Sequence, residues 1–343
     1  MKTTQLTGQT EPVATTSPAA MRAITQSRYG TVPEDVMRLD QIARPGIAGN
    51  EVLVRVRAAG LDRGTWHVMV GQPYLMRLLG FGFRRPRNRV PGLDVAGTVA
   101  EVGAEVTRFA AGDEVFGIGR GSFAEYAAAR EDTLARKPAA LSFEQAAAVA
   151  VSGLTALQGL RDAGRIQPGQ NVLVIGASGG VGSYAVQLAK YFGAEVTGVC
   201  GTAKADLVRS IGADHVIDYT CADFADGQRR YDLILDIGGN SPLSRLRRAL
   251  TRRGTLVIAG GEGAKWTGVG RQLRALALSV LVRQRLTMCV SRHCQADLDT
   301  LRLLTEGGQV IPVVDRTYPL AETPKAMRRL YAEDARGKIV ITV

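Results

Sequence analysis

The chain has 343 residues, of which 45% are hydrophobic and 22% are charged, and 43 basic against 32 acidic residues give a formal net charge of +11. This composition is typical of a folded globular protein and excludes a wholly disordered or fibrous chain, and the length predicts about two domains. No apolar stretch approaches the roughly 20 residues of a membrane-spanning helix, so we expect no membrane insertion.

Two further compositional features bear on location and partners. The four cysteines (Cys200, Cys221, Cys289 and Cys294) form no CxxC pair, which predicts a reducing, cytoplasmic location. The basic residues are scattered and no aromatic residues are interleaved among them, so we expect a solvated surface that tolerates anionic ligands instead of a nucleic-acid-binding one.

The first part of the chain is polar and then β-rich. Residues 1–20 contain many Thr and Pro and lack the apolar core of a signal peptide, which predicts a disordered leader; Met21 is then the start of the folded chain, or even the initiator. Residues 51–57, 95–102 and 113–116 are short runs with β-type patterns separated by Gly and Pro, which indicates a small β-rich domain.

The second part alternates strands and helices. An Ala-rich helical stretch precedes the apolar strand 170–175, and further strands are expected at 195–199, 215–217, 231–235, 255–258 and 286–290. This alternation predicts a parallel sheet with helices on both faces. Because the tail after about residue 310 returns to β-type runs, residues 338–343 could rejoin the first domain. The predicted fold class is therefore α/β, with one domain over 21–144 and 291–343 and another over 145–290.

A glycine-rich turn over residues 174–182 (VIGASGGVG) lies between a predicted strand and a predicted helix. In this context a pyrophosphate can lie on the backbone N–H groups at the start of the helix. Gly179 and Gly180, between Ser178 and Val181, would let the backbone approach the phosphates, and Gly182 would let the helix pack closely on the strand. The alternative is a glycine turn with no ligand.

The residues at the end of the next strand distinguish proteins that bind NAD from proteins that bind NADP. A carboxylate there would bind the ribose hydroxyls, but residues 200–204 (CGTAK) contain none. A 2′-phosphate would be accepted by Thr202 and Lys204, which favours NADPH, although Lys204 as an ordinary surface lysine remains an alternative.

Together these segments resemble the zinc-independent quinone oxidoreductase branch of the medium-chain dehydrogenase/reductase superfamily. The resemblance covers residues 21–343 and is carried by the segments 89–99, 112–117, 123–126, 176–190, 211–219 and 335–340. It implies a GroES-like catalytic domain, a Rossmann domain for NADPH, and a cleft between them. It also places Tyr219 beside Lys204 at the coenzyme phosphate, Thr155 and Gly260 near the nicotinamide, and Lys338 at the coenzyme.

Zinc is not expected. The three catalytic zinc ligands of the zinc alcohol dehydrogenases in this superfamily fall at Asp62, Leu93 and Val151, and two of these side chains cannot bind metal. Without a Lewis acid, hydride transfer to an acceptor that is already electrophilic, a quinone or an α,β-unsaturated carbonyl, is favoured over alcohol oxidation.

Three residues are candidates for the catalytic side of the site. Asp62 would orient the nicotinamide ribose or act as an acid, or it is a solvated loop residue. His67 borders the same cleft or has a structural role. Tyr74 lines the substrate pocket or has only a packing role. The family commonly has Asn and Asp where this chain has Asp62 and Thr65, which leaves the acceptor class open. Two apolar and basic segments, 73–91 and 266–290, could cover an apolar substrate or form an interface.

Several functions therefore compete. The first is an NADPH-dependent reductase of quinones or enones, and the alternatives are a biosynthetic reductase of a bulky apolar intermediate and an NADPH-binding protein without turnover. A short-chain dehydrogenase is excluded, because none of the nine tyrosines is followed by a lysine four residues later. A homodimer with a small-molecule substrate is expected.

Overall fold

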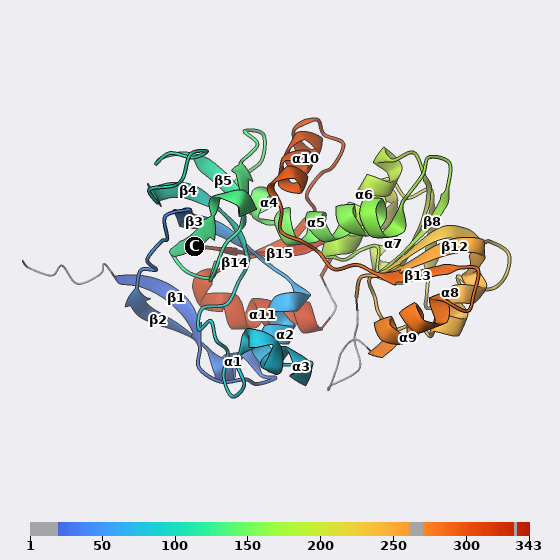
Figure 1. Ribbon diagram of the computed structural model, residues 1–343, viewed down its shortest axis with the longest axis horizontal. Coiled ribbons are helices and arrows are strands. Elements are labelled where there is room, and N and C mark those ends of the chain that lie inside the picture. The colour runs from blue at the N-terminus through green and yellow to red at the C-terminus, as the bar shows by residue number, and fades with distance from the viewer. Residues whose placement is uncertain (1–19, 261–269, 333–334) are drawn as a thin grey trace, which may run out of the picture.

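The computed structural model describes residues 20–260, 270–332 and 335–343. The predicted leader, residues 1–20, lies outside this range except for Ala20. Figure 1 shows two bodies side by side, one containing the N-terminal strands and the C-terminal end, the other containing the middle of the chain. No helix in the described ranges is long and apolar enough to cross a membrane.

The middle of the chain forms a six-stranded sheet that is parallel throughout, as predicted. Its strand order is β10-β9-β8-β11-β12-β13. The strands are β8 (Asn171–Ile175), β9 (Glu195–Cys200), β10 (His215–Asp218), β11 (Tyr231–Asp236), β12 (Leu250–Ile258) and β13 (Arg285–Met288). This is the Rossmann strand order, which reverses beside β8 and brings the carboxyl ends of β8 and β11 together there.

Both faces of this sheet are covered, which explains the apolar strand sequences. Val172 and Val174 of β8 pack into one hydrophobic core, whereas Leu173 and Ile175 pack into another on the opposite face. The covering helices are α5 (Ala150–Gln158), its π-helical continuation (Gly159–Gly164), α6 (Gly180–Tyr191), α7 (Ala205–Ser210), α8 (Leu243–Ala249) and α9 (Gly270–Ser279).

The other body is built on a seven-stranded sheet of order β14-β15-β3-β4-β5-β7, with β6 also paired to β3. Its strands are β3 (Glu51–Leu61), β4 (Asp94–Val102), β5 (Glu114–Ile118), β6 (Tyr126–Arg130), β7 (Leu134–Arg136), β14 (Val314–Pro319) and β15 (Lys338–Thr342). β15 pairs antiparallel with β3, so the tail does return to the first part of the chain. A separate hairpin joins β1 (Ala20–Gln26) and β2 (Met37–Ala43).

Short helices complete this body and link it to the other. They are α1 (Pro33–Val36), α2 (Arg63–Val70), α3 (Tyr74–Met76) with a π-helical turn (Arg77–Phe81), α4 (Phe143–Ala147), α10 (Gln295–Glu306) and α11 (Thr323–Tyr331), with 3₁₀ turns at Glu131–Thr133 and Leu320–Glu322. A further 3₁₀ turn, Thr202–Lys204, follows β9 in the body of the parallel sheet. In Figure 1, α4, α5 and α6 run across the middle of the molecule from one sheet toward the other. We keep residues 21–144 with 291–343, and residues 145–290, as the proposed domain division.

Candidate coenzyme site and active site

The glycine turn joins β8 to α6 at the carboxyl edge of the parallel sheet. Gly176 turns the chain with φ +85°, and its N–H donates to the carbonyl of Val199 in β9. α6 then begins at Gly180, with Gly179 as its N-cap and no side chain capping it. The first N–H groups of this 12-residue helix therefore have no partner within the helix, and the positive end of its dipole lies at the turn.

Two glycines here are required by close backbone approach. A Cβ on Gly182 would lie 2.0 Å from the carbonyl oxygen of Gly176, and one on Gly260 would lie 1.9 Å from that of Ile237. By contrast, a Cβ on Gly179 would meet only the Gly176 oxygen, at 3.5 Å. Gly182 thus holds α6 tightly against the turn, while Gly260 brings the end of β12 against the end of β11.

The expected adenosine end lies at the carboxyl ends of β9 and β10. Thr202 and Lys204 form the 3₁₀ turn after β9, and the exposed Tyr219 follows β10, with its hydroxyl close to Gly201. The backbone N–H of Tyr219 donates to the carbonyl of Cys200. The tertiary structure therefore brings Thr202, Lys204 and Tyr219 to neighbouring positions on one sheet edge.

A carboxylate that the sequence analysis missed lies in the same place. Asp218, the last residue of β10, is opposite Cys200 in the sheet and accepts a 2.5 Å hydrogen bond from the Thr202 hydroxyl. Hydrogen bonds from Thr202 and Thr220 lower the pKa of Asp218, so it is ionised at neutral pH. The signal was available: Asp218 directly follows a predicted strand next to the glycine-turn strands.

The expected nicotinamide end involves α5 and the loops after β11 and β12. Thr155 lies within α5, and its hydroxyl donates to the carbonyl of Val151 at 2.7 Å. The N–H groups of Ala259 and Gly260 donate to the carbonyl of Asp236 at 2.9 and 3.1 Å. Arg271 of α9 pairs with the buried carboxylate of Asp236 and so fixes this loop. The residues that follow Gly260, 261–269, lie outside the described ranges.

Lys338 connects the glycine turn to the other domain. It is only 2% exposed; its ammonium lies 2.6 Å from Asp94 of β4 and 3.2 Å from the Ser152 hydroxyl of α5. The N–H of Gly337 also donates to the carbonyl of Ser178 at 2.8 Å, and a Cβ on Gly180 would lie 3.1 Å from the Ser152 hydroxyl. The Lys338 ammonium is therefore engaged with Asp94 and Ser152, beside the turn.

Asp94 is the centre of a buried polar cluster. Besides its ion pair, it accepts a 2.7 Å hydrogen bond from the N–H of Val151 at the start of α5. Burial raises the pKa of Asp94 and is opposed by the charge of Lys338. Nearby, the buried hydroxyl of Tyr184 has no hydrogen-bond partner among the described residues, and burial together with Asp94 raises its pKa well above the usual range. The sequence analysis quoted Asp94 within a motif but assigned it no role.

Asp62 is the N-cap of α2. Its Oδ1 atom accepts from the N–H of Thr65 at 2.9 Å, which satisfies one free donor at the helix start. Its Oδ2 atom is buried, and no described residue donates a hydrogen bond to it. Asp62 is also close enough to Asp94 that its charge raises the pKa of Asp94. One oxygen is thus structural, and the other is buried without a donor among the described residues.

His67 and Tyr74 have different surroundings from Asp62. His67 is five positions beyond Asp62, a rotation of about 140° around the axis of α2, so the two side chains leave the helix on different faces. The backbone carbonyl of His67 accepts from Gln72 at 3.1 Å. Tyr74 begins α3, where the guanidinium of Arg77 lies 4.8 Å from its ring and 4.3 Å from that of Tyr29.

The segment that follows Tyr74 faces solvent. Leu78 and Phe83 are 69% and 67% exposed, and Phe83 lines a hollow together with Arg84, Arg85, Arg87 and Arg89. That this segment covers an apolar substrate stays a prediction. In the described residues, no group of three His, Cys, Asp or Glu side chains is arranged to hold a metal ion.

Comparison with known proteins agrees with this architecture. Residues 48–139 match the family model described as an alcohol dehydrogenase GroES-like domain, and residues 211–341 match the one described as a zinc-binding dehydrogenase. The chain is 32% identical to a chloroplast envelope quinone oxidoreductase homolog of Arabidopsis thaliana, over 94% of this chain and 98% of that protein. It is likewise 32% identical to a 2-methylene-furan-3-one reductase of Solanum lycopersicum, over 94% and 79% of the two chains.

Solved structures agree as well. A mycobacterial protein crystallised in complex with NADPH superposes with a TM-score of 0.79 at 25% identity, over 94% of this chain and all of that one. The fold, the two family models and the full-length relatives all point the same way. The chain therefore belongs to the quinone oxidoreductase-like branch of the medium-chain dehydrogenase/reductase superfamily of oxidoreductases.

Proposed function

We propose that this protein is an NADPH-dependent, zinc-independent reductase that transfers hydride to a quinone or an α,β-unsaturated carbonyl. The observation that carries this proposal is the uncapped N-terminus of α6. It packs so closely against the glycine turn that position 182 has no room for a side chain larger than that of glycine. The relatives named as a quinone oxidoreductase homolog and as a reductase of a methylene-furanone support the acceptor class.

The residues present fit a dinucleotide coenzyme. The free N–H groups from Gly180 to Gly182, with Ser178 and Val181 in the same turn, would hold its pyrophosphate. Thr155 and Gly260 would border the nicotinamide. Lys338, through Ser152, and its neighbour Gly337, through the Ser178 carbonyl, would position the turn. When bound, the reduced coenzyme supplies hydride from nicotinamide C4.

The choice of NADPH rests on the adenosine end. Lys204 and the hydroxyls of Thr202 and Tyr219 would receive the 2′-phosphate, and a lysine ammonium makes charge-assisted hydrogen bonds to phosphate. Asp218 opposes this, because its carboxylate would repel a 2′-phosphate beside Thr202. The proposed phosphate position would therefore combine one cation, Lys204, with one anion, Asp218, and the preference for NADPH would depend on the balance of these two charges.

The catalytic chemistry needs little from the protein beyond positioning. Quinones and enones accept hydride directly, so the main requirement is to place the acceptor carbon against the coenzyme. The free Oδ2 atom of Asp62 provides a buried acceptor for a ribose hydroxyl or a site for a proton. Zinc independence rests on Leu93 and Val151, which stand at expected ligand positions and have no ligating atoms.

The decisive experiment is a titration of the protein with NADPH and NADH, followed by turnover with a panel of quinones and enones. We expect the wild-type protein to bind NADPH more tightly than NADH. Lys204→Ala should reduce this preference about tenfold, since one charge-assisted hydrogen bond contributes roughly 1.5–3 kcal/mol. Asp218→Asn should strengthen the preference, because it removes the carboxylate that repels the 2′-phosphate. Arg38→Gln, which removes an exposed charge from β2, is the matched control for Lys204→Ala.

Other outcomes would redirect the proposal. Equal or tighter NADH binding would refute the coenzyme assignment, and stoichiometric zinc in the purified protein would refute zinc independence. NADPH binding with no turnover on any acceptor would identify a coenzyme-binding protein, whereas turnover confined to bulky apolar enones would identify a biosynthetic reductase. A cytoplasmic location stays part of the proposal. So does a homodimer, which is supported by the position of β13 at the edge of the sheet.

A further inference from the structure

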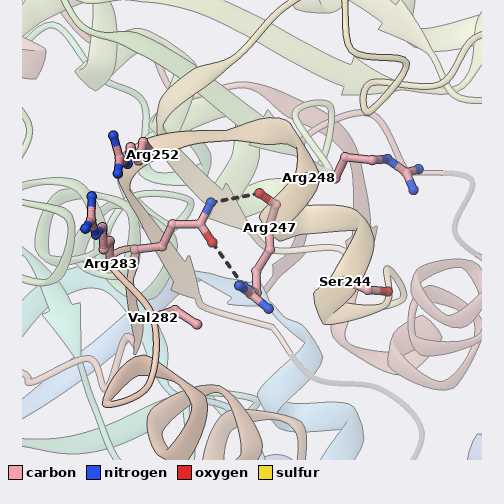
Figure 2. A pocket seen from close by; sticks show the side chains of 7 residues that line it. Ser244, Arg247, Arg248, Arg252, Val282 and Arg283 are labelled. Carbon is pink, nitrogen blue, oxygen red and sulfur yellow. Dashed lines mark hydrogen bonds between the residues drawn. The ribbon is translucent and has the colours of Figure 1, made fainter.

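Arginine side chains line a hollow of about 420 Å³ in the body of the parallel sheet, which Figure 2 shows. There Arg247 donates to the side chain of Gln284 at 3.0 Å, and its backbone carbonyl accepts from the same side chain at 2.9 Å. Val282 and Arg283, also on its wall, lead into β13, the sheet edge proposed for the homodimer. This hollow therefore adjoins an expected interface, and we assign it no ligand.

Another hollow, of about 600 Å³, lies in the other body, between α3 and β4 in the chain. Its volume is in the range of small-molecule sites. Residues 63–93 contain six arginines and no acidic residue. Four of these arginines line the hollow and have no acidic partner among the described residues: Arg84, Arg85, Arg87 and Arg89. An anion bound there would relieve the repulsion between their guanidinium groups.

The loop that carries these arginines is held in a fixed shape. The N–H of Arg87 donates to the carbonyl of Phe81 at 2.8 Å and so closes the loop. Gly82 turns the chain with φ +106°, where a Cβ would lie 2.1 Å from the carbonyl oxygen of Arg85. The Tyr29 hydroxyl donates to the carbonyls of Phe81 and Gly82 at 3.1 and 2.6 Å. Burial raises the pKa of Tyr29, so this donor stays protonated at neutral pH.

The hollow lies at the far end of α2 from Asp62. α2 begins after Asp62 and ends before Gly71, so it spans about 12 Å. At that end a Cβ on Gly71 would lie 2.6 Å from the ring of Tyr29, the residue that holds the loop. In Figure 1, α2 and α3 lie on the side of their body that faces the body of the parallel sheet. A molecule that fills the hollow and reacts beside Asp62 must therefore be longer than about 12 Å.

The residues that line the hollow fit a phosphorylated nucleotide. Guanidinium groups recognise phosphate through paired hydrogen bonds. The side chain of Phe83, which also lines the hollow, is 67% exposed and offers a ring on which a base can stack. Together with the distance to Asp62, these features fit a ligand with a nucleotide at one end, a long uncharged linker, and a reacting group at the other end.

We propose that this hollow, here termed the arginine hollow, binds the 3′-phosphorylated adenosine diphosphate of coenzyme A, and that the acceptor is an α,β-unsaturated acyl thioester at the other end of the same molecule. The pantetheine arm then runs along the length of α2. The proposal rests on the proposed reductase function and names the class of its enone.

The reaction needs no reactant beyond those already named. The β-carbon of the enoyl thioester accepts hydride, with its two electrons, from the reduced coenzyme, and the π electrons of the C=C bond move toward the thioester carbonyl. The α-carbon then accepts a proton from solvent. The enoyl thioester is thus reduced to the saturated acyl thioester, the nicotinamide is oxidised, and the thioester bond is kept.

The shape of the site favours this ligand over two others. The guanidinium groups line a concave space, whereas a bilayer presents a flat surface to them. Single-stranded nucleic acid is typically bound on successive aromatic side chains, whereas the arginine hollow offers the ring of Phe83. One nucleotide at the end of a small molecule matches both the volume and the lining.

The first test measures binding without turnover. Desulfo-coenzyme A, which lacks the thiol, is titrated calorimetrically into the full chain in the presence and absence of NADPH. We expect binding in both cases. Arg84→Gln/Arg87→Gln should weaken it at least tenfold, because hydrogen bonds to a charged phosphate are lost. Phe83→Ala should weaken it about fivefold, whereas Phe83→Trp, which keeps a stacking ring, should bind as the wild type does.

The second test measures specificity in turnover. Crotonyl-coenzyme A is compared with the crotonyl thioester of N-acetylcysteamine, which carries the same enone and no nucleotide. We expect kcat/KM to be at least tenfold higher for the coenzyme A thioester, because binding of its remote end contributes to the rate. The ratio of the two kcat/KM values should fall at least tenfold in Arg84→Gln/Arg87→Gln, mainly through KM of the longer substrate.

The matched control removes two charges elsewhere in the same domain. Arg38→Gln/Arg316→Gln changes two exposed arginines of β2 and β14 and should leave both the affinity for desulfo-coenzyme A and the kcat/KM ratio within about twofold. Unchanged melting temperatures in all variants would show that the fold is intact.

Four results would overturn the proposal: equal kcat/KM for the two thioesters, equal losses in the control and arginine-hollow variants, displacement of NADPH by desulfo-coenzyme A, or equally tight binding of inorganic pyrophosphate. Turnover of quinones but of neither thioester would overturn it and leave the reductase function standing. Desulfo-coenzyme A binding that depends on Arg84 and Arg87, without turnover of any acceptor, would uphold the binding site and refute the reductase function. Retention on phosphatidylglycerol vesicles that desulfo-coenzyme A does not reduce would indicate a membrane surface instead.

Discussion

At the scale of single residues, Asp62 combines a structural and a chemical position. Asp62→Ala removes the N-cap of α2 and should lower the free energy of unfolding by about 1 kcal/mol. Asp62→Asn keeps a capping oxygen, so we expect unchanged stability in urea unfolding and turnover within about threefold of the wild type, since an electrophilic acceptor needs only a weak proton source. Loss of turnover in Asp62→Asn with normal stability would instead identify Asp62 as the acid.

The cysteines make a second prediction at this scale. Burial, with a smaller effect of Asp162, raises the pKa of Cys289 from 9.0 to about 11, whereas Cys221 is exposed. The Cys289 thiol is therefore protonated at pH 8, and iodoacetamide should modify Cys221 well before Cys289, as measured by peptide mass spectrometry. Because the pKa is raised in the folded state, the associated stability is complete below pH 9 and is lost as the pH rises toward 11.

A Cys221→Ser variant is the control for this assignment. Its rapid phase of modification should disappear, and early labelling of Cys289 in either protein would contradict the burial of that thiol.

At the scale of elements, the junction of β8 and α6 tests the coenzyme site. Gly182→Ala places a Cβ 2.0 Å from a backbone oxygen and must push α6 away from the turn, which we expect to cost about 3 kcal/mol or more of stability. Gly179→Ala meets nothing closer than 3.5 Å at an ordinary φ of −86°, so its melting temperature should be nearly unchanged.

The two variants should differ in a second way. Gly179→Ala should weaken NADPH, because its added methyl group stands where the backbone must approach the phosphates. Full NADPH affinity in Gly179→Ala, measured by fluorescence titration, would show that the pyrophosphate lies elsewhere.

At the scale of the whole molecule, the Asp94–Lys338 pair of one domain contacts the other domain beside the glycine turn, because Asp94 accepts from the N–H of Val151 and Lys338 donates to the Ser152 hydroxyl. Lys338→Met leaves the Asp94 carboxylate buried without its partner and should cost about 3–5 kcal/mol in urea unfolding. Asp94→Asn/Lys338→Met removes both charges and should recover most of that loss. We expect NADPH affinity to recover with it, since Lys338 is engaged with Asp94 and Ser152.

This double variant also separates two roles for Lys338. Recovered stability with NADPH affinity still lost would show that the Lys338 ammonium contacts the coenzyme directly, as the family resemblance implies, and does not act through the turn.

The sequence alone determined the fold class and the glycine turn on which the proposed coenzyme site is centred. Apolar strands of five or six residues, separated by helices with one apolar face, can form only a covered parallel sheet, and the glycine turn at Gly176–Gly182 is a local signal because its steric requirement acts over a few residues. The predicted strands 170–175 and 195–199 accordingly lie within one residue of β8 and β9.

Only the tertiary structure decided what surrounds that turn. Asp94, Ser152 and Lys338 are far apart in the chain. The pairing of β15 with β3, and of β3 with β4, brings Lys338 near Asp94, and the packing of α5 against this pair adds Ser152 to the buried cluster. Asp218 reaches Thr202 only because β10 lies in register beside β9. Charges that meet across strands leave no pattern in a linear sequence, since their attraction depends on distance in space and not on separation along the chain.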